Sequence, residues 1–294
     1  MEIEMKIGII GTGMLGNAVG QHLLESGYDL TVFNRTNEKT GHLKEKGAKV
    51  AKTPKEVAER SDFVIIIVKD AKAVNDVSFE KDGIVFGKHG SLAVADMSTI
   101  DPVESKGISQ QFEKNGIKKI DIPVMGGPNV AVSGNLVVMA SGDRQTFRDF
   151  KEVLETIGNK VFFLGEHGVA HAIKLAMNLQ ITMLALALSE GITLVRKEGI
   201  DPKKFLDVLN STYFKTGMSQ NKAYKMIQDQ FEATFTLENL KKDASTIVKT
   251  ARCNNIELPM IKKADEVYND AVMQGFGKLD YTGILAYISK INNI

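Results

Sequence analysis

Polar side chains interrupt the most apolar stretch of the sequence, residues 172–188, at helical spacing. Steps of three, four and four residues place them on one face of a helix: His171, Lys174, Asn178 and Thr182. A helix that is apolar on nearly every side is expected to be buried, and a lysine is rarely buried without a partner. We therefore expect this face to border a cleft or another polar surface. In a cleft, the ammonium group of Lys174 could stabilise negative charge on a ligand and donate a proton to it.

Lys174 also has a simpler interpretation, in which a surface lysine lays its methylene stem along the helix and keeps its charge in water. Its apolar flanks and the asparagine one turn later favour a functional lysine. For His171, a structural histidine and a substrate contact are both open. No histidines have the spacing of metal ligands and Cys253 is the single cysteine, so no metal site is expected.

A glycine-rich turn near the N-terminus has the G-x-G-x-x-G spacing of a dinucleotide-binding loop. A β-branched run ends at Ile10, and an amphipathic helix begins near residue 14. In this context the glycines permit a tight turn, let the backbone approach a pyrophosphate and let the helix pack on the strand. The alternative is a strand–helix turn without a ligand. The predicted cofactor loop consists of Gly11, Thr12, Gly13, Met14, Leu15 and Gly16.

The end of the second predicted strand bears on the choice between NAD and NADP. An NAD-binding site has an Asp or Glu here to bind the ribose 2′-OH, whereas this sequence has Asn34, followed by Arg35 and Thr36. A guanidinium can pair with a 2′-phosphate through two hydrogen bonds, and no acidic residue stands here to repel it. The residues favour NADP(H), with NAD(H) possible if Arg35 is only a solvated loop residue.

Short runs of apolar, mostly β-branched residues alternate with helix-like segments in the first 165 residues. The runs are continuous, as in strands buried on both faces of a parallel sheet, and they span residues 6–10, 30–33, 63–68, 91–96, 117–122, 136–140 and 161–164. Helical patterns occur between them at 14–25 and 54–60. After Gly165 only helices are expected, at 169–197, 202–209, 219–228, 237–251, 260–274 and 281–291.

This alternation predicts an α/β fold with a Rossmann-type, doubly wound, mostly parallel sheet in residues 1–165, the NAD(P)-binding domain. Residues 166–294 are expected to form an all-α domain for substrate binding and dimerisation. The long helix is too apolar to be covered by the short helices of one subunit, so we expect a homodimer or a homotetramer.

Composition narrows the class of protein. The 294 residues are 43% hydrophobic and 25% charged, which excludes a disordered chain, and a net charge of +1 gives no basic field for nucleic acid. The N-terminus lacks a signal-peptide pattern, and the polar residues within 172–188 argue against a membrane span. A single cysteine fits a reducing compartment, so we expect a cytoplasmic protein without membrane or nucleic-acid partners.

The sequence resembles the β-hydroxyacid dehydrogenase family over essentially its whole length. Four motifs follow the glycine loop in the family's order, and five motifs together are far more specific than one loop. They are Asp96-Met97-Ser98-Thr99, residues 121–127 with 134–136, residues 165–178, and residues 235–237 with Lys242-Asp243. The resemblance implies NAD(P)-dependent hydride transfer between a short β-hydroxyacid and its semialdehyde, as in 3-hydroxyisobutyrate dehydrogenase.

On the substrate side, the resemblance implies that Lys174 is the catalytic lysine and that Asn178 holds either the substrate carboxylate or this lysine. Thr99 is expected to contact the nicotinamide or the substrate. The backbone N–H groups of Gly126 and Gly127 are expected to bind the substrate carboxylate.

On the cofactor side, the resemblance places Val68 and Lys69 beside the cofactor at the end of a strand. Lys242 is expected to reach the cofactor from the helical domain. An ordinary lysine has a pKa of about 10.4, so reduction should dominate at neutral pH and oxidation should improve as the pH rises.

Met125 departs from the family at a substrate-binding position that is usually serine. A flexible apolar side chain replaces a hydroxyl that could bind a carboxylate. The departure weakens the assignment of 3-hydroxyisobutyrate as the substrate and makes a glyoxylate/succinic semialdehyde reductase the alternative. An alternative from another class is a non-catalytic NADPH-binding protein, although a pure binder has no need of the pair Lys174 and Asn178.

Overall fold

The computed structural model describes residues 5–294 and has two compact units, Met1–Lys174 and Leu175–Ile294. Helix α9 (Val169–Lys197) begins in the first unit and continues into the second. The boundary expected at residue 165 lies shortly before this helix.

The first unit is built on a nine-stranded sheet of order β3-β2-β1-β4-β5-β6-β8-β7, with β9 paired to β8. Neighbours from β3 to β6 are parallel, and β8 runs antiparallel to β6 and β7 but parallel to β9. The chain moves from β1 out to β3 and then returns to β4 on the other side of β1, as in a doubly wound fold. The strands are β1 (Lys6–Ile10), β2 (Asp29–Phe33), β3 (Lys49–Val50), β4 (Phe63–Ile66), β5 (Ala93–Asp96), β6 (Lys118–Asp121), β7 (Val124–Met125), β8 (Val137–Gly142) and β9 (Lys160–Phe163).

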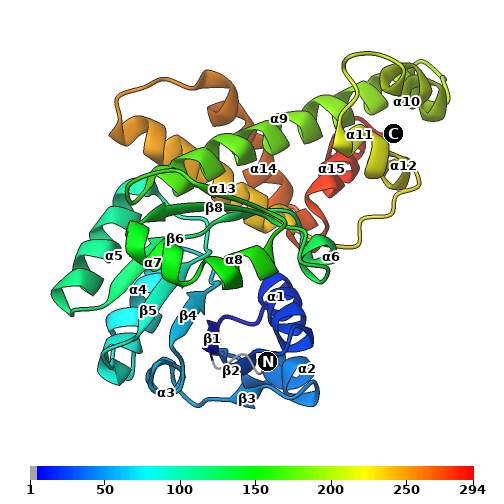
Figure 1. The fold of residues 1–294 in the computed structure, drawn as a ribbon. Coiled ribbons are helices and arrows are strands. Elements are labelled where there is room, and N and C mark those ends of the chain that lie inside the picture. The colour runs from blue at the N-terminus through cyan, green and yellow to red at the C-terminus, as the bar shows by residue number, and fades with distance from the viewer. Residues whose placement is uncertain (1–4) are drawn as a thin grey trace. The chain divides into compact units, whose positions relative to one another are not determined.

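Helices cover both faces of this sheet (Figure 1), and alternate strand residues pack beneath them. In β4, Phe63 and Ile65 join the core under α1, α2 and α8, whereas Val64 and Ile66 join the core under α3, α4 and α5. All four side chains are fully buried, which confirms the fold class predicted from continuous apolar runs. The helices are α1 (Met14–Glu25), α2 (Gly41–Glu45), α3 (Pro54–Glu59), α4 (Ala71–Phe79), α5 (Pro102–Lys114), α6 (Pro128–Ala131), α7 (Arg144–Asp149) and α8 (Lys151–Ile157).

The second unit is helical, and its only β contact in residues 175–294 is an isolated bridge between Thr236 and Asp280. After α9 come α10 (Pro202–Asn210), α11 (Gly217–Asn221), α12 (Ala223–Met226), α13 (Leu237–Cys253), α14 (Pro259–Met273) and α15 (Ile284–Ile291). The single helix predicted over 219–228 is divided at Lys222, where φ is −112°, into α11 and α12, and it ends at Met226. The ammonium group of Lys222 lies 2.8 Å from the carboxylate of Asp280, next to the bridge at residues 236 and 280.

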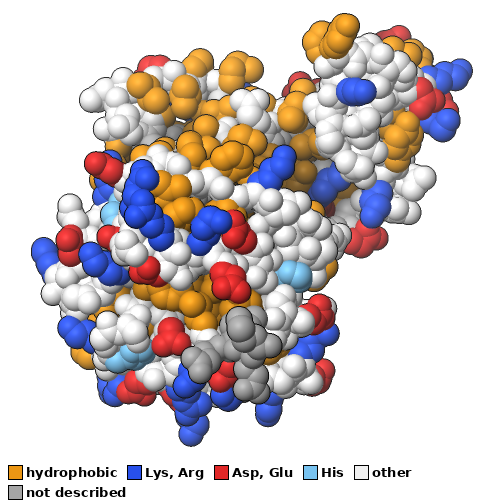
Figure 2. Space-filling view, viewed as in Figure 1, with side chains coloured by type: hydrophobic (Ala, Val, Ile, Leu, Met, Phe, Trp, Pro, Cys, Tyr) orange, Lys and Arg blue, Asp and Glu red, His pale blue; other side chains and the backbone are white. Residues whose placement is uncertain are grey.

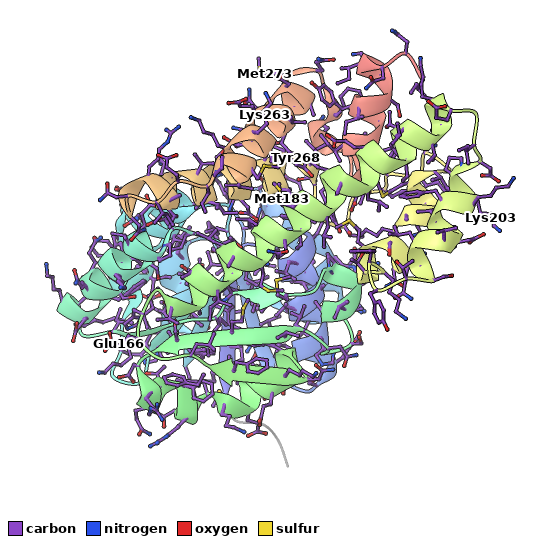
Figure 3. The ribbon with its side chains drawn as sticks, turned by 90° about the horizontal axis from the view of Figure 1, so that it is seen from above. Glu166, Met183, Lys203, Lys263, Tyr268 and Met273 are labelled. Atoms are coloured by element: carbon purple, nitrogen blue, oxygen red, sulfur yellow. The ribbon has the colours of Figure 1, made fainter. Side chains whose placement is uncertain are left out.

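Helix α9 is 29 residues long and continuous, with Glu166 in the loop before it and Met183 near its middle (Figure 3). One side of it stays exposed in a single chain: Ile173, Met177 and Leu184 are 37–42% exposed and Leu194 is 65% exposed. Within one chain, therefore, the helix is not buried on that side, and hydrophobic side chains are visible along it in Figure 2. By length and composition α9 could cross a membrane, but core helices of soluble proteins pass the same test, so this is weak support for a membrane span.

Candidate active site

Two glycines of the predicted cofactor loop allow close backbone contacts at the end of β1, one with the segment after β4 and one with α1. Gly11 has φ +103°, and a side chain there would lie 2.1 Å from the carbonyl oxygen of Ile67. A side chain on Gly16 would lie 2.0 Å from the carbonyl oxygen of Gly11. These contacts let α1 start close to the strand end, as the loop spacing predicted.

Gly13 has different surroundings from the other two glycines. A side chain on Gly13 would meet no atom within 4 Å, and Gly13 is exposed. Helix α1 begins at the next residue without a side-chain cap, so Met14 and Leu15 supply its first N–H groups. An open surface over uncapped helix N–H groups fits the pyrophosphate of a dinucleotide.

Hydrogen bonds hold the glycine loop to the end of β2. The N–H of Thr12 donates to Oδ1 of Asn34 (3.1 Å), and Nδ2 of Asn34 donates to the carbonyl oxygen of Thr36 (2.8 Å). The Thr12 hydroxyl donates to the carbonyl oxygen of Lys39 (2.9 Å). The polar groups of Thr12 and Asn34 are thus used in hydrogen bonds that hold the glycine loop in place. Arg35, the next residue along, is exposed.

A buried link joins the carboxyl ends of β4 and β5. The N–H of Val68 donates to Oγ of Ser98 (3.1 Å), and the N–H of Ser98 donates to Oδ1 of Asp96 (2.9 Å). Asp96 and Ser98 are buried, whereas Thr99 is half-buried and Lys69 is exposed. The link holds Val68 at the edge of the sheet where doubly wound folds bind their ligands, and Thr99 follows Ser98 directly at the same edge.

Lys174 contacts the predicted substrate loop. Its Nζ donates to Sδ of Met125 at 3.3 Å, and both side chains are half-buried. A thioether is a weak acceptor, so Met125 locates the amine without neutralising its charge. Gly126, with φ +121°, turns the chain after Met125, and a side chain on Gly127 would meet no atom within 4 Å. The structure therefore brings the lysine and an open stretch of backbone to the same loop.

His171 lies in the first turns of α9 and is fully buried, with Nε2 3.5 Å from Oδ1 of Asp121. This position favours the structural interpretation of His171 over a substrate contact. Burial raises the pKa of Asp121, but the charge of Lys119 and the contact with His171 outweigh it and hold this pKa well below its usual range. Burial lowers the pKa of nearby His167. In residues 5–294 no group of three or more His, Cys, Asp or Glu side chains is placed to hold a metal ion.

In the helical unit, Asn178 of α9 is tied to the Lys242-Asp243 pair of α13. Nδ2 of Asn178 donates to Oδ2 of Asp243 (2.6 Å), and Nζ of Lys242 lies 2.5 Å from Oδ1 of Asp243. Because a carboxylate only accepts, the amide nitrogen faces Asp243, and the buried Oδ1 of Asn178 is left without a partner among the described residues. An amide oxygen only accepts hydrogen bonds, so Oδ1 cannot donate to a carboxylate.

Sequence reasoning gave no role to Asp243 or Asp121, although both stand in motifs that it quoted. Their contacts join segments 65 and 47 residues apart, Asn178 with Asp243 and Asp121 with Gly168. Residue spacing along one segment does not predict contacts between segments so far apart. The sequence showed only an acidic residue inside each motif. Asp243 stands beside a lysine, and Asp121 stands at the end of a predicted strand.

Comparisons with known proteins agree with this architecture. Residues 6–165 match the NAD binding domain of 6-phosphogluconate dehydrogenase, and residues 168–288 match the family described as NAD-binding of NADP-dependent 3-hydroxyisobutyrate dehydrogenase. Glyoxylate/succinic semialdehyde reductase 1 of Arabidopsis thaliana is 29% identical over 96% of this chain and 97% of its own length. The uncharacterized oxidoreductase YfjR of Bacillus subtilis is 30% identical over 97% of this chain and 100% of its own length. A crystal structure of 3-hydroxyisobutyrate dehydrogenase from Salmonella typhimurium is 25% identical and has a TM-score of 0.87. The match covers 97% of this chain and 100% of that structure's chain.

Fold and matches together define a class, the NAD(P)-dependent oxidoreductases that join a Rossmann unit to a helical unit. Within that class, the chain belongs to the β-hydroxyacid dehydrogenase family, which acts on small molecules. The resemblance found in the sequence is thereby confirmed.

Proposed function

We propose that the protein is an NADP(H)-preferring enzyme that interconverts a short β-hydroxyacid and its semialdehyde, with Lys174 as the proton donor. The observation that carries the proposal is the position of Nζ of Lys174, 3.3 Å from Met125 in the loop whose next residues are Gly126 and Gly127. An ammonium group there adjoins open backbone that can take a carboxylate.

Each part of the chain has a defined task in this reaction. A bound nicotinamide supplies the hydride to the carbonyl carbon of the substrate. The ammonium group of Lys174 hydrogen-bonds the carbonyl oxygen, stabilises the negative charge that grows on it and donates a proton to it. In the reverse direction the neutral amine accepts the hydroxyl proton. We assign Oδ1 of Asn178, one helical turn further along α9, to the same amine, because this acceptor has no hydrogen-bond partner among the described residues.

For the substrate, the thioether of Met125 leaves carboxylate binding to backbone N–H groups, because it has no proton to donate. We take 3-hydroxyisobutyrate and its semialdehyde as the first candidates. Glyoxylate and succinic semialdehyde are the alternative, and the relative from Arabidopsis thaliana bears those substrates in its name.

For the cofactor, the preference for NADP(H) rests on Arg35. The amide of Asn34 is used by the glycine loop, so the exposed guanidinium of the next residue, Arg35, is the group that we assign to a 2′-phosphate. NAD(H) remains usable in this proposal, because the contacts over Gly13 are common to both cofactors.

A steady-state panel tests the reaction and the cofactor together. Semialdehydes of two to four carbons are assayed with NADPH and with NADH, in the wild-type enzyme and in Arg35→Ala. We expect turnover with NADPH, and a KM for NADPH that rises about tenfold or more in Arg35→Ala because a charge-assisted contact is lost, with the KM for NADH unchanged. An equal change for both cofactors would refute the NADP preference, and tight NADPH binding without turnover of any carbonyl compound would leave a non-catalytic NADPH-binding protein.

We also propose that the protein is a homodimer or homotetramer. The exposed side of α9 presents Ile173, Met177, Leu184 and Leu194 in a single chain, and exposed apolar rows of this kind mark subunit contacts. Multi-angle light scattering should give at least twice the 32.2 kDa of one chain. A clean monomer at assay concentration would contradict the proposal.

A further inference from the structure

The first turn of α9 is capped by side chains that come from the sheet of the first unit. The N–H of Gly168 donates to Oδ2 of Asp121 (2.7 Å), and the N–H of Ala170 donates to Oγ of Ser141 (3.2 Å). The Ser141 hydroxyl in turn donates to Oδ2 of Asp121 (3.2 Å). Groups at a helix N-terminus that lack intrahelical partners are thus satisfied from β6 and β8.

Asp121 is the centre of this arrangement and is fully buried. Besides the contacts of Oδ2, its Oδ1 accepts from Oγ of Ser105 on α5 (2.7 Å) and from Nζ of Lys119, and lies 3.5 Å from His171. A buried carboxylate is stable only when paired and hydrogen-bonded, and both conditions are met here. The negative charge also lies at the N-terminal end of the helix dipole, where it is favourable.

The same carboxylate is connected to both partners of the Lys174–Met125 contact, along the chain to Met125 and through hydrogen bonds to the start of α9. Asp121 ends β6, and the chain then runs through β7 directly to Met125. Gly168 and Ala170, which Asp121 and Ser141 hold, precede Lys174 by six and four residues on α9. Displacement of the first turn of α9 would therefore move Nζ of Lys174 relative to Met125.

We propose that Asp121, acting with Ser141, is the positioning residue of the catalytic lysine. It holds the start of α9 at the end of β6, so that the amine is fixed against the substrate loop before substrate arrives. The inference rests on the proposed function, because it assigns a purpose to the placement of Lys174. A carboxylate that only stabilised the fold would affect unfolding and leave the chemical step unchanged.

The chain offers a matched pair of variants. Ser141→Ala and Ser105→Ala each remove one fully buried hydroxyl that donates to Asp121, but only Ser141 also accepts from α9. We expect kcat to fall about tenfold or more in Ser141→Ala, since small displacements of a catalytic group cost rate steeply, with little change in Ser105→Ala. Kd for NADPH should be unchanged in both, and circular dichroism melting curves report whether each variant is folded.

Two further measurements separate positioning from stability. The double variant Lys119→Met/Asp121→Asn removes both buried charges together, so no charge is left unpaired, and we expect kcat to fall about 100-fold. In a Lys174→Ala background, Ser141→Ala should have almost no additional effect on residual turnover, because no amine is left to position. Equal losses of kcat in Ser141→Ala and Ser105→Ala, or additive losses with Lys174→Ala, would overturn the inference. Normal turnover in Lys174→Ala alone would instead overturn the proposed function beneath it.

Discussion

Replacement of Lys174 by alanine will lower kcat for semialdehyde reduction by about 10³-fold and leave Kd for NADPH essentially unchanged. The loss is large because one group supplies both the charge stabilisation and the proton for the oxygen that becomes the hydroxyl. Kd is unaffected because the predicted cofactor loop, Gly11–Gly16, is formed from β1 and α1. Consumption of NADPH at saturating substrate gives kcat, and equilibrium titration of NADPH gives Kd.

The control for this variant is Lys72→Ala. Lys72 is an exposed lysine on α4 whose Nζ lies 2.7 Å from Asp76, so its removal deletes the same side chain and a surface ion pair of little energetic value. Lys72→Ala should keep the wild-type kcat. Lys174→Ala with a kcat close to that of Lys72→Ala would remove the lysine from the mechanism.

Gly13→Ala will weaken NADPH binding about 100-fold without lowering the melting temperature. Gly13 has φ −69°, which alanine adopts readily, and a side chain there meets no protein atom within 4 Å. The added methyl group instead occupies the surface that a pyrophosphate needs, and separates it from the N–H groups of α1. Titration calorimetry with NADPH, together with a thermal melt of the free protein, measures both effects.

Gly107→Ala on α5 is the matched substitution, since a side chain at Gly107 also meets nothing within 4 Å. It should leave NADPH binding intact and stabilise α5 by about 0.5–1 kcal/mol. Gly16→Ala should behave oppositely to Gly13→Ala and destabilise the fold, because its methyl group would press on the carbonyl oxygen of Gly11. Unchanged NADPH affinity in Gly13→Ala would mean that the loop does not hold the pyrophosphate.

Much of the fold follows from local sequence. β4 could be found because Phe63, Val64, Ile65 and Ile66 are apolar on both faces, and α1 and α9 have the predicted bounds because their patterns are long and begin after glycines. The strands β3 and β7 were missed because each has only two residues and too little pattern to detect.

The parts of the site that depend on distant contacts could not be predicted in the same way. Spacing along α9 found Lys174 and Asn178, but gave no indication that Met125 would contact the first or that Asp243 would orient the second. Likewise, the sequence showed that α9 is apolar. It did not show which side of α9 the rest of the chain covers, because that depends on helices far along the sequence. Exposure of Ile173 and Leu184 reflects that arrangement.

The cap of α9 also has a consequence for the order in which the chain folds. Asp121 and Gly168 are 47 residues apart, so the first amides of α9 gain their partners only after β6 and β8 have come together. During refolding, the middle of the helix can form from local interactions, whereas its start must wait for the sheet. Protection of the Gly168 and Ala170 amides from hydrogen exchange should accordingly follow the opening of the sheet and not the fraying of the helix to which they belong.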